Sequence, residues 1–104
     1  MSSHIAVSIE KNKLTLSGVL DYESVLTVDA QGREWLSNFA AQDCCLDLSL
    51  VTYSSSAGVA LLLGWLRAAR KEKKNLRILP LPKNILALAR VNGLDDLLKL
   101  HGVM

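Results

Sequence analysis

The stretch "VTYSSSAGVALLLGWLRAARKEKK", residues 51–74, determines how the rest of the chain is interpreted. A β-rich run leads through three serines and an Ala-Gly pair into a leucine-rich segment with a basic end. This order predicts a strand, a serine loop and a helix from about Ser56 to Lys74. What the three adjacent hydroxyls of Ser54, Ser55 and Ser56 do is the main functional question that the sequence raises.

Length and composition predict one compact domain over residues 1–104. Half of the 104 residues are apolar, so a core can form without disulfides or metal. The net charge of +2 gives no reason to expect a nucleic-acid partner. The N-terminus lacks the layout of a signal peptide, and no apolar run approaches the ~20 residues of a membrane span. We therefore expect a soluble, intracellular protein without direct membrane insertion.

The first half of the chain predicts two strands, a helix and a third strand. The segments "HIAVSIE" and "KLTLSGV" alternate and flank a "KNK" turn, which favours an antiparallel hairpin. Asp21 is a plausible N-cap for a helix in "DYESVLTVDAQGREWLSNFAA". Its apolar positions recur at mostly helical spacing, at Val25, Val28, Trp35, Leu36 and Phe39. In "DCCLDLSLV", alternation predicts a strand with Leu46, Leu48 and Leu50 on one face.

The second half alternates between helices and strands. The basic end of the serine-led helix suits the negative end of the helix dipole, and Asn75 is a reasonable stop. "LRILPL" predicts a strand, and "PKNILALARVNG" predicts a helix with Pro82 near its start and Gly93 just past its end. "LDDLLKLHG" is a short helix or an edge strand. The order β-β-α-β-α-β-α plus a terminal element predicts an α/β fold, with helices packed on a mixed sheet of four to five strands.

Nucleophilic or metal chemistry has little support in the sequence. A catalytic serine needs a base and an oxyanion site, but the two histidines, His4 and His101, lie near the termini. Neither a Gly-x-Ser-x-Gly elbow nor a phosphate-binding Gly-Lys-Ser/Thr loop is present. The adjacent Cys44 and Cys45 are expected to be reduced packing residues. We predict no catalytic residue, no metal and no cofactor; capping of the following helix is the simplest role for one serine.

The serine-led helix carries two apolar stripes, although packing on a sheet needs only one. The first stripe comprises Val59, Leu62, Leu63, Leu66 and Ala69, and the second comprises Leu61, Trp65 and Ala68. The second stripe either packs beside a neighbouring helix or forms an exposed patch with Trp65 as its anchor. The basic run "RAARKEKK" is either a solvated helix end or a contact for an acidic partner surface or anionic lipid headgroups.

Three segments together resemble the STAS domain family, named after sulfate transporters and anti-sigma factor antagonists. They are "LSGVLDYES", "CLDLSLVTYSSSAGVALLL" and "NLRILPLPKNILALARVNGLDDLLKL", in the order and spacing of that family. The resemblance covers nearly the whole chain and implies the STAS fold. Asp47, on the strand before the serines, is expected to orient this region by hydrogen bonding rather than to act in catalysis.

Within the family, "AGVALLL" at residues 57–63 resembles the MlaB-like branch. These are small cytoplasmic STAS subunits of ABC transporters that move phospholipid between the membranes of Gram-negative bacteria. When Gly58 is aligned with the family glycine, Ala57 occupies the position of the serine that anti-sigma factor antagonists phosphorylate. Ser56 then matches a threonine through which MlaB-like proteins contact their ATPase.

The resemblance implies a non-catalytic accessory subunit that binds, and stabilises or activates, a cytoplasmic MlaF-like ATPase. That ATPase would belong to a complex with a membrane permease and a substrate-binding MCE subunit, which maintains outer-membrane lipid asymmetry. Two copies per complex and a peripheral position on the inner membrane follow from the same resemblance. The expected partner-binding residues are Ser54, Ser55, Ser56, Ala57, Gly58, Leu61 and Trp65, with Ser56 a possible phosphorylation site.

Two alternatives remain open at this point. An anti-sigma factor antagonist would need phosphate on the loop, and Ala57 argues against that function. A domain that binds nucleotide or lipid by itself has no specific residue support. The sequence leaves open the direction of transport and the face of helix 56–74 that meets a partner.

Overall fold

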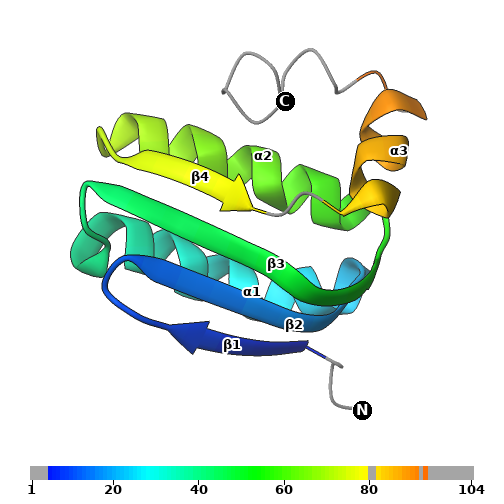
Figure 1. Cartoon of the computed structure of the whole chain (residues 1–104), viewed down its shortest axis with the longest axis horizontal. Coiled ribbons are helices and arrows are strands. Elements are labelled where there is room, and N and C mark those ends of the chain that lie inside the picture. The colour runs from blue at the N-terminus through cyan, green and yellow to red at the C-terminus, as the bar shows by residue number, and fades with distance from the viewer. Residues whose placement is uncertain (1–4, 80–81, 92, 94–104) are drawn as a thin grey trace.

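The computed structural model describes residues 5–79, 82–91 and 93, which form four strands and three α-helices in an alternating order (Figure 1). The elements are β1 (Ile5–Ile9), β2 (Lys13–Leu20), α1 (Tyr22–Glu34), the π-helical turn η1 (Trp35–Phe39), β3 (Asp43–Ser54), α2 (Ser56–Lys71), β4 (Asn75–Leu79) and α3 (Lys83–Val91). This order confirms the β-β-α-β-α-β-α prediction. The predicted terminal element in "LDDLLKLHG" lies outside the described residues.

The four strands form one mixed sheet in the order β1-β2-β3-β4. β1 is antiparallel to β2, whereas β2, β3 and β4 are parallel. Each parallel connection passes through a helix, and Figure 1 shows α1 and α2 behind the same face of the sheet. Both helices therefore begin at the end of the sheet where β2 and β3 finish.

The predicted hairpin is confirmed, and it is tied to the end of the first helical segment. Val7 pairs with Leu16 across β1 and β2, and Leu16 is fully buried. Trp35 is buried in the core, and its indole Nε1 donates to the carbonyl oxygen of Glu10 in the hairpin turn at 2.8 Å. Phe39 is 58% exposed, because the wider π-helical turn from Trp35 rotates it off the apolar face of α1.

Irregularities in the pairing of β2 with β3 explain why the predicted alternation of β3 fails after Leu48. Thr15 pairs with Asp47, but Ser17 pairs with Leu50, so β3 carries one extra residue there. Asp47 Oδ1 accepts the backbone N–H of Ser49 at 2.9 Å, so its side chain bonds locally within β3, and among the described residues it makes no hydrogen bond to the serines that it was expected to orient. Since the extra residue moves the following side chains to the opposite face, Leu50 is 57% exposed rather than buried.

The C-terminal end of α2 differs slightly from the prediction. The helix ends at Lys71, and Lys73 adopts a left-handed conformation with φ of 58°. The backbone N–H of Lys73 donates to Arg70, and that of Lys74 donates to Ala69, the two bonds of a Schellman motif. This turn stops the helix, and Asn75 begins β4 instead of terminating α2. For α3, the predicted Pro82 and Gly93 positions are confirmed, with Gly93 at φ 68°.

The second apolar stripe of α2 packs against α1. Trp65 is fully buried, its indole Nε1 donates to Asp29 Oδ1 at 3.0 Å, and its ring lies against Gly32. A Cβ atom on Gly32 would lie 2.1 Å from Trp65 Cζ2, so only glycine permits this approach. The expectation that Trp65 anchors an exposed patch is therefore wrong, because this side of α2 is covered by a neighbouring helix.

Both cysteines are free, as expected, and Cys44 is a buried packing residue in β3. Its burial raises the pKa of the Cys44 thiol, because desolvation disfavours the thiolate.

We expect Gly32→Ala to lower the free energy of unfolding by about 1–2 kcal/mol. The rigid Trp65 ring must shift, which costs more than the ~1 kcal/mol that alanine gains over glycine in a helix. Gly64→Ala is the matched control, because its new Cβ meets only the flexible end of Arg33 at 2.8 Å. Urea denaturation of both variants measures the difference; equal stabilities would contradict the packing argument.

We expect stability to fall in acid partly through Asp21 and Asp47. The backbone N–H of Ser24 lowers the pKa of Asp21 from its ordinary value of 3.8, and that of Ser49 does the same for Asp47. A carboxylate with a lowered folded-state pKa contributes stability that is present above 3.8 and lost as pH falls through the folded value.

The double variant Asp21→Asn/Asp47→Asn tests this prediction, because asparagine keeps the acceptor oxygen but does not titrate. Urea unfolding measured from neutral pH down through the acid decline of the wild type is expected to give a shallower decline for the variant. Identical pH profiles for the variant and the wild type would refute the assignment.

Candidate functional site

The three serines form a direct junction between β3 and α2 rather than a loop. β3 ends at Ser54 and α2 begins at Ser56, so only Ser55 separates the two elements. Asn84 of α3 holds the end of β3: the backbone N–H of Ser54 donates to Asn84 Oδ1 at 2.8 Å, and Asn84 Nδ2 donates to the Ser54 carbonyl at 3.1 Å. The prediction of a serine loop is thus corrected to a strand–helix junction that α3 braces.

Each serine has a different environment. Ser54 is fully buried, and its Oγ donates to the carbonyl of Ser55 at 2.9 Å. Ser55 is the N-cap of α2, with its Oγ accepting the backbone N–H of Ala57 at 3.2 Å, as predicted for one of the three. Ser56 is exposed in the first turn of α2. Among the three hydroxyls, that of Ser56 is the one presented to solvent.

Two residues expected to touch a partner are instead internal to the junction. Ser54 cannot reach a partner with its side chain because it is buried. Gly58 is also buried, and a Cβ there would lie 2.1 Å from Ser54 Oγ and 3.1 Å from Leu20 Cβ. Gly58 therefore allows α2 to start close against the ends of β2 and β3, and its effect on any contact surface is indirect.

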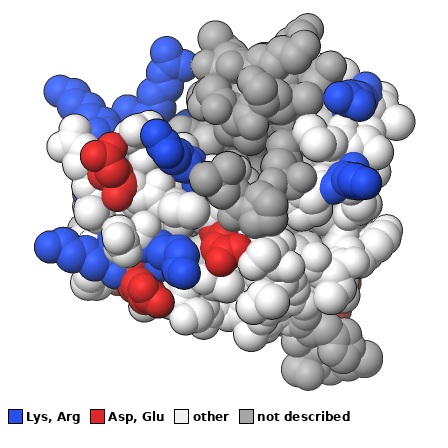
Figure 2. All heavy atoms as spheres, viewed as in Figure 1, with Lys and Arg blue, Asp and Glu red and all other residues white. Residues whose placement is uncertain are grey.

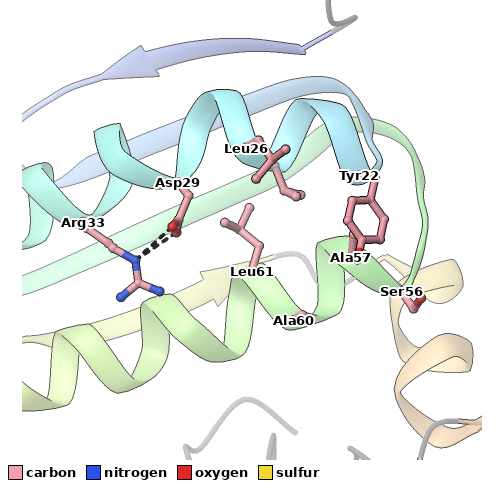
Figure 3. Close-up of a pocket in the computed structure, with 9 residues that line it drawn as sticks. Tyr22, Leu26, Asp29, Arg33, Ser56, Ala57, Ala60 and Leu61 are labelled. Atoms are coloured by element: carbon pink, nitrogen blue, oxygen red, sulfur yellow. Dashed lines mark hydrogen bonds and ion pairs between the residues drawn. The ribbon is translucent and has the colours of Figure 1, made fainter.

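Beside the junction, α1 and α2 enclose a groove of about 440 Å³ (Figure 3). In Figure 3, Tyr22 and Leu26 extend from α1 across from Ala57 and Leu61 of α2. Tyr22 is 80% exposed and Leu26 is 76% exposed, whereas Leu61 is almost fully buried. The groove thus has two projecting apolar side chains on one side and small residues on the other.

Tyr22 and Leu26 were not predicted from the sequence to be functional residues. A usable signal was present, because the two residues are four apart and therefore share one helix face. That face is offset from the buried position Val28. Asp21, confirmed as the N-cap, and Ser24 form a capping box that fixes where α1 begins and hence where Tyr22 stands.

An ion pair lies at the far end of the groove. Arg33 Nε donates to Asp29 Oδ1 at 3.0 Å, and Asp29 also accepts the indole N–H of Trp65. The Arg33 side chain remains 49% exposed. Figure 3 shows its guanidinium group extending from α1 toward α2.

The described residues provide a groove and hydrogen-bonding groups rather than a cluster of reactive side chains. Within residues 5–79, 82–91 and 93, no cluster of His, Cys, Asp or Glu could hold a metal ion. Over the same residues, none of the helices combines the length and apolar character needed to cross a bilayer. The two histidines considered above, His4 and His101, lie outside the described residues.

Comparison with known proteins identifies the type of domain. A family model described as MlaB, STAS domain, matches residues 4–99. The structure of the unphosphorylated anti-sigma factor antagonist SpoIIAA aligns with a TM-score of 0.67 and 15% identity, over 96% of this chain and 98% of that one. The structure of the Bacillus cell fate determinant SpoIIAA in its phosphorylated form aligns with a TM-score of 0.65 and 17% identity, over 88% of this chain and 86% of that one. No curated protein sequence matches the chain.

We expect Ser55→Ala to destabilise the protein by about 1 kcal/mol, because a free backbone N–H of α2 loses its acceptor. Ser56→Ala is expected to change stability by no more than about 0.5 kcal/mol, because Ser56 is exposed. Ser55→Asp should restore the cap, since aspartate is an equally good N-cap residue. Thermal denaturation followed by circular dichroism measures the stability of the three variants. Equal losses of stability in Ser55→Ala and Ser56→Ala would contradict the assignment of Ser55 as the N-cap.

Proposed function

The chain belongs to the MlaB family of STAS domains, and from this membership we propose that it is a non-catalytic accessory subunit of a phospholipid-transporting ABC complex. Its partner is a cytoplasmic MlaF-like ATPase, in a complex with a membrane permease and a substrate-binding MCE subunit. The complex maintains the lipid asymmetry of the outer membrane, and the domain lies on the inner face of the inner membrane through its partners.

The observation that carries this proposal is the exposed apolar groove at the start of α2. Tyr22 and Leu26 project into solvent and line the same groove as Ser56 and Ala57. Contiguous exposed apolar side chains mark interaction surfaces, and aromatic residues are enriched among those that dominate binding. Small side chains on the other wall let a partner backbone come close, with the Ser56 hydroxyl available for a hydrogen bond.

The surface is held in place before any partner arrives. Ser55 caps α2, Asp21 caps α1, and Trp65 joins the two helices through Asp29. A pre-organised surface loses little conformational entropy on binding, which favours affinity. The domain influences ATP turnover by binding one conformation of the ATPase more tightly than another, and two copies act on the two-fold ATPase pair.

A phosphorylation switch of the anti-sigma type is the second candidate, because the structural neighbours are anti-sigma factor antagonists. The exposed Ser56 hydroxyl is sterically free to accept phosphate, and a helix N-terminus favours negative charge. Ala57, however, supplies no hydroxyl at the position matching the family's phosphorylated serine. We therefore assign Ser56 to partner contact, with phosphorylation a possible way to block it.

We expect Ser56→Arg to abolish recovery of an ABC ATPase and its permease from native membranes, because a long charged side chain would occupy the contact surface. Ser8→Arg is the matched control, because Ser8 is also exposed but alternates with the core-facing Val7 and so lies on the opposite face of the sheet. Circular dichroism verifies that both variants fold.

The outcomes separate the candidate functions. Recovery of the ATPase by the wild type and Ser8→Arg, but not by Ser56→Arg, supports docking through the start of α2. Equal recovery by all three keeps the transporter function and removes the start of α2 from the interface. Recovery of an anti-sigma factor without an ATPase, together with phosphate transfer to Ser56 by its kinase, would replace the proposal with the switch.

A further inference from the structure

A second hollow adjoins the groove beside the serine junction. It has a volume of about 410 Å³ and lies between the later turns of α1 and α2, where Gly64, Arg67 and Lys71 form the α2 side. Arg33 lines both hollows. The two hollows are therefore consecutive parts of one surface, which is named the α1–α2 groove below.

The first part of the α1–α2 groove is apolar. Tyr22 and Leu26 project from α1 and face Ala57, Ala60 and Leu61 of α2 (Figure 3). Burying a side chain such as Leu26 against an occupant is favourable, because apolar surface is removed from water. An occupant that covered Tyr22 and Leu26 would gain this stabilisation without any rearrangement of the fold.

The second part is basic. Arg33 uses Nε for Asp29, and within the described residues neither of its Nη atoms has a hydrogen-bond partner. Arg67 and Lys71 are exposed one turn apart on α2, and in the described part of the chain neither pairs with a carboxylate. Glu72, the acidic residue of this hollow, accepts a hydrogen bond from Ser37 at 3.2 Å. Three cations thus converge there with free donor capacity.

Figure 2, viewed from the same side as Figure 1, shows the face of the sheet that α1 and α2 do not cover. Lys and Arg side chains gather at its left end, where β4 begins, together with Asp and Glu side chains, and further Lys or Arg side chains lie at the right beside α3. The lower right of that face, where β2 and β3 finish, is mostly uncharged. Both helices lie behind the sheet in this view, so the charge of the α1–α2 groove is given by its own lining residues.

We propose that the α1–α2 groove binds an acidic, amphipathic segment of a partner protein. Apolar side chains of that segment pack between Tyr22, Leu26 and Leu61, and its carboxylates pair with Arg33, Arg67 and Lys71. The planar guanidinium groups of Arg33 and Arg67 suit two-point contact with a carboxylate. This inference rests on the proposed function only in taking the ATPase subunit as the source of the segment.

The geometry fixes the spacing of the segment. Ala60 and Arg67 are seven residues apart on α2, which corresponds to about 10 Å along the helix axis. A bound helix would therefore carry its acidic residues about two turns from its apolar residues, and an extended segment about three residues away. A third helix lying between two parallel helices is a common mode of peptide recognition.

A protein segment fits better than an anionic membrane surface. The cations border a hollow, and two carboxylates, Asp29 and Glu72, lie beside them. Those carboxylates would repel an anionic bilayer surface, and one of them already pairs with Arg33. A narrow segment with separated carboxylates can satisfy the cations and avoid Asp29 and Glu72.

The test begins with a displayed library of short random peptides, from which the peptides that bind the wild-type chain are selected. We expect enrichment of peptides in which apolar and acidic residues are separated as described, and binding that weakens as salt rises, since exposed charges are screened. Arg67→Glu/Lys71→Glu and Leu26→Glu should each weaken the enriched peptides by about tenfold or more, a loss typical of a dominant contact. Ser8→Arg, on the opposite face, is the control and should bind normally.

These substitutions are at exposed positions, so the variants should fold, and circular dichroism verifies it. Enriched peptides without an acidic residue, unchanged binding to Arg67→Glu/Lys71→Glu, or no enrichment at all would overturn the proposal. Binding to phosphatidylglycerol vesicles that requires Arg67 and Lys71 but is indifferent to Leu26→Glu would replace it with a lipid-headgroup site.

Native membrane pull-downs with the same variants separate this inference from the proposed function. Loss of the ATPase in both groove variants supports the two together. Unchanged ATPase recovery by Arg67→Glu/Lys71→Glu keeps the transporter function and overturns the groove as its contact. If the wild type recovers no ATPase but the peptides show the expected pattern, the groove chemistry stands and the proposed function fails.

Discussion

The contact between Trp65 and Gly32 is the constraint on which the rest of the surface depends. The indole ring of Trp65 occupies the space that a Cβ atom at position 32 would need. The two helices therefore approach closely at that point. The indole N–H donates to Asp29, which also receives Arg33, and this one carboxylate therefore couples helix packing to an exposed cation. Trp65 thereby sets how closely α1 and α2 lie beside each other beneath the groove.

The strand–helix junction also depends on close packing. Ser54 and Gly58 are buried against each other, and Asn84 extends the hydrogen bonding of β3 beyond its last residue. These contacts leave Ser56 exposed at a fixed position in the first turn of α2. A hydroxyl held on a capped helix end, next to two projecting apolar side chains, suits recognition of another protein, which is how we interpret membership in the MlaB family of STAS domains.

Local patterns predicted the order of elements and the two helix caps, because alternation, N-cap chemistry and turn residues act over a few positions. They failed where one residue changed the spacing. The extra residue after Asp47 turned Leu50 outward, and the π-helical turn at Trp35 did the same to Phe39. Such departures depend on pairing with another strand or on packing beneath a helix, neither of which leaves a periodic signal.

The sequence by itself determined the mixed α/β order, the capping of α1 by Asp21 and of α2 by one of the serines, and the family resemblance that the family model bears out. Only the tertiary structure decided which apolar stripe of α2 is covered and that Trp65 is internal. It also selected Ser56 as the exposed hydroxyl and placed Tyr22, Leu26 and Arg33 along one groove. The physical reason is that caps and periodicity arise within one element, whereas burial depends on what lies across from it.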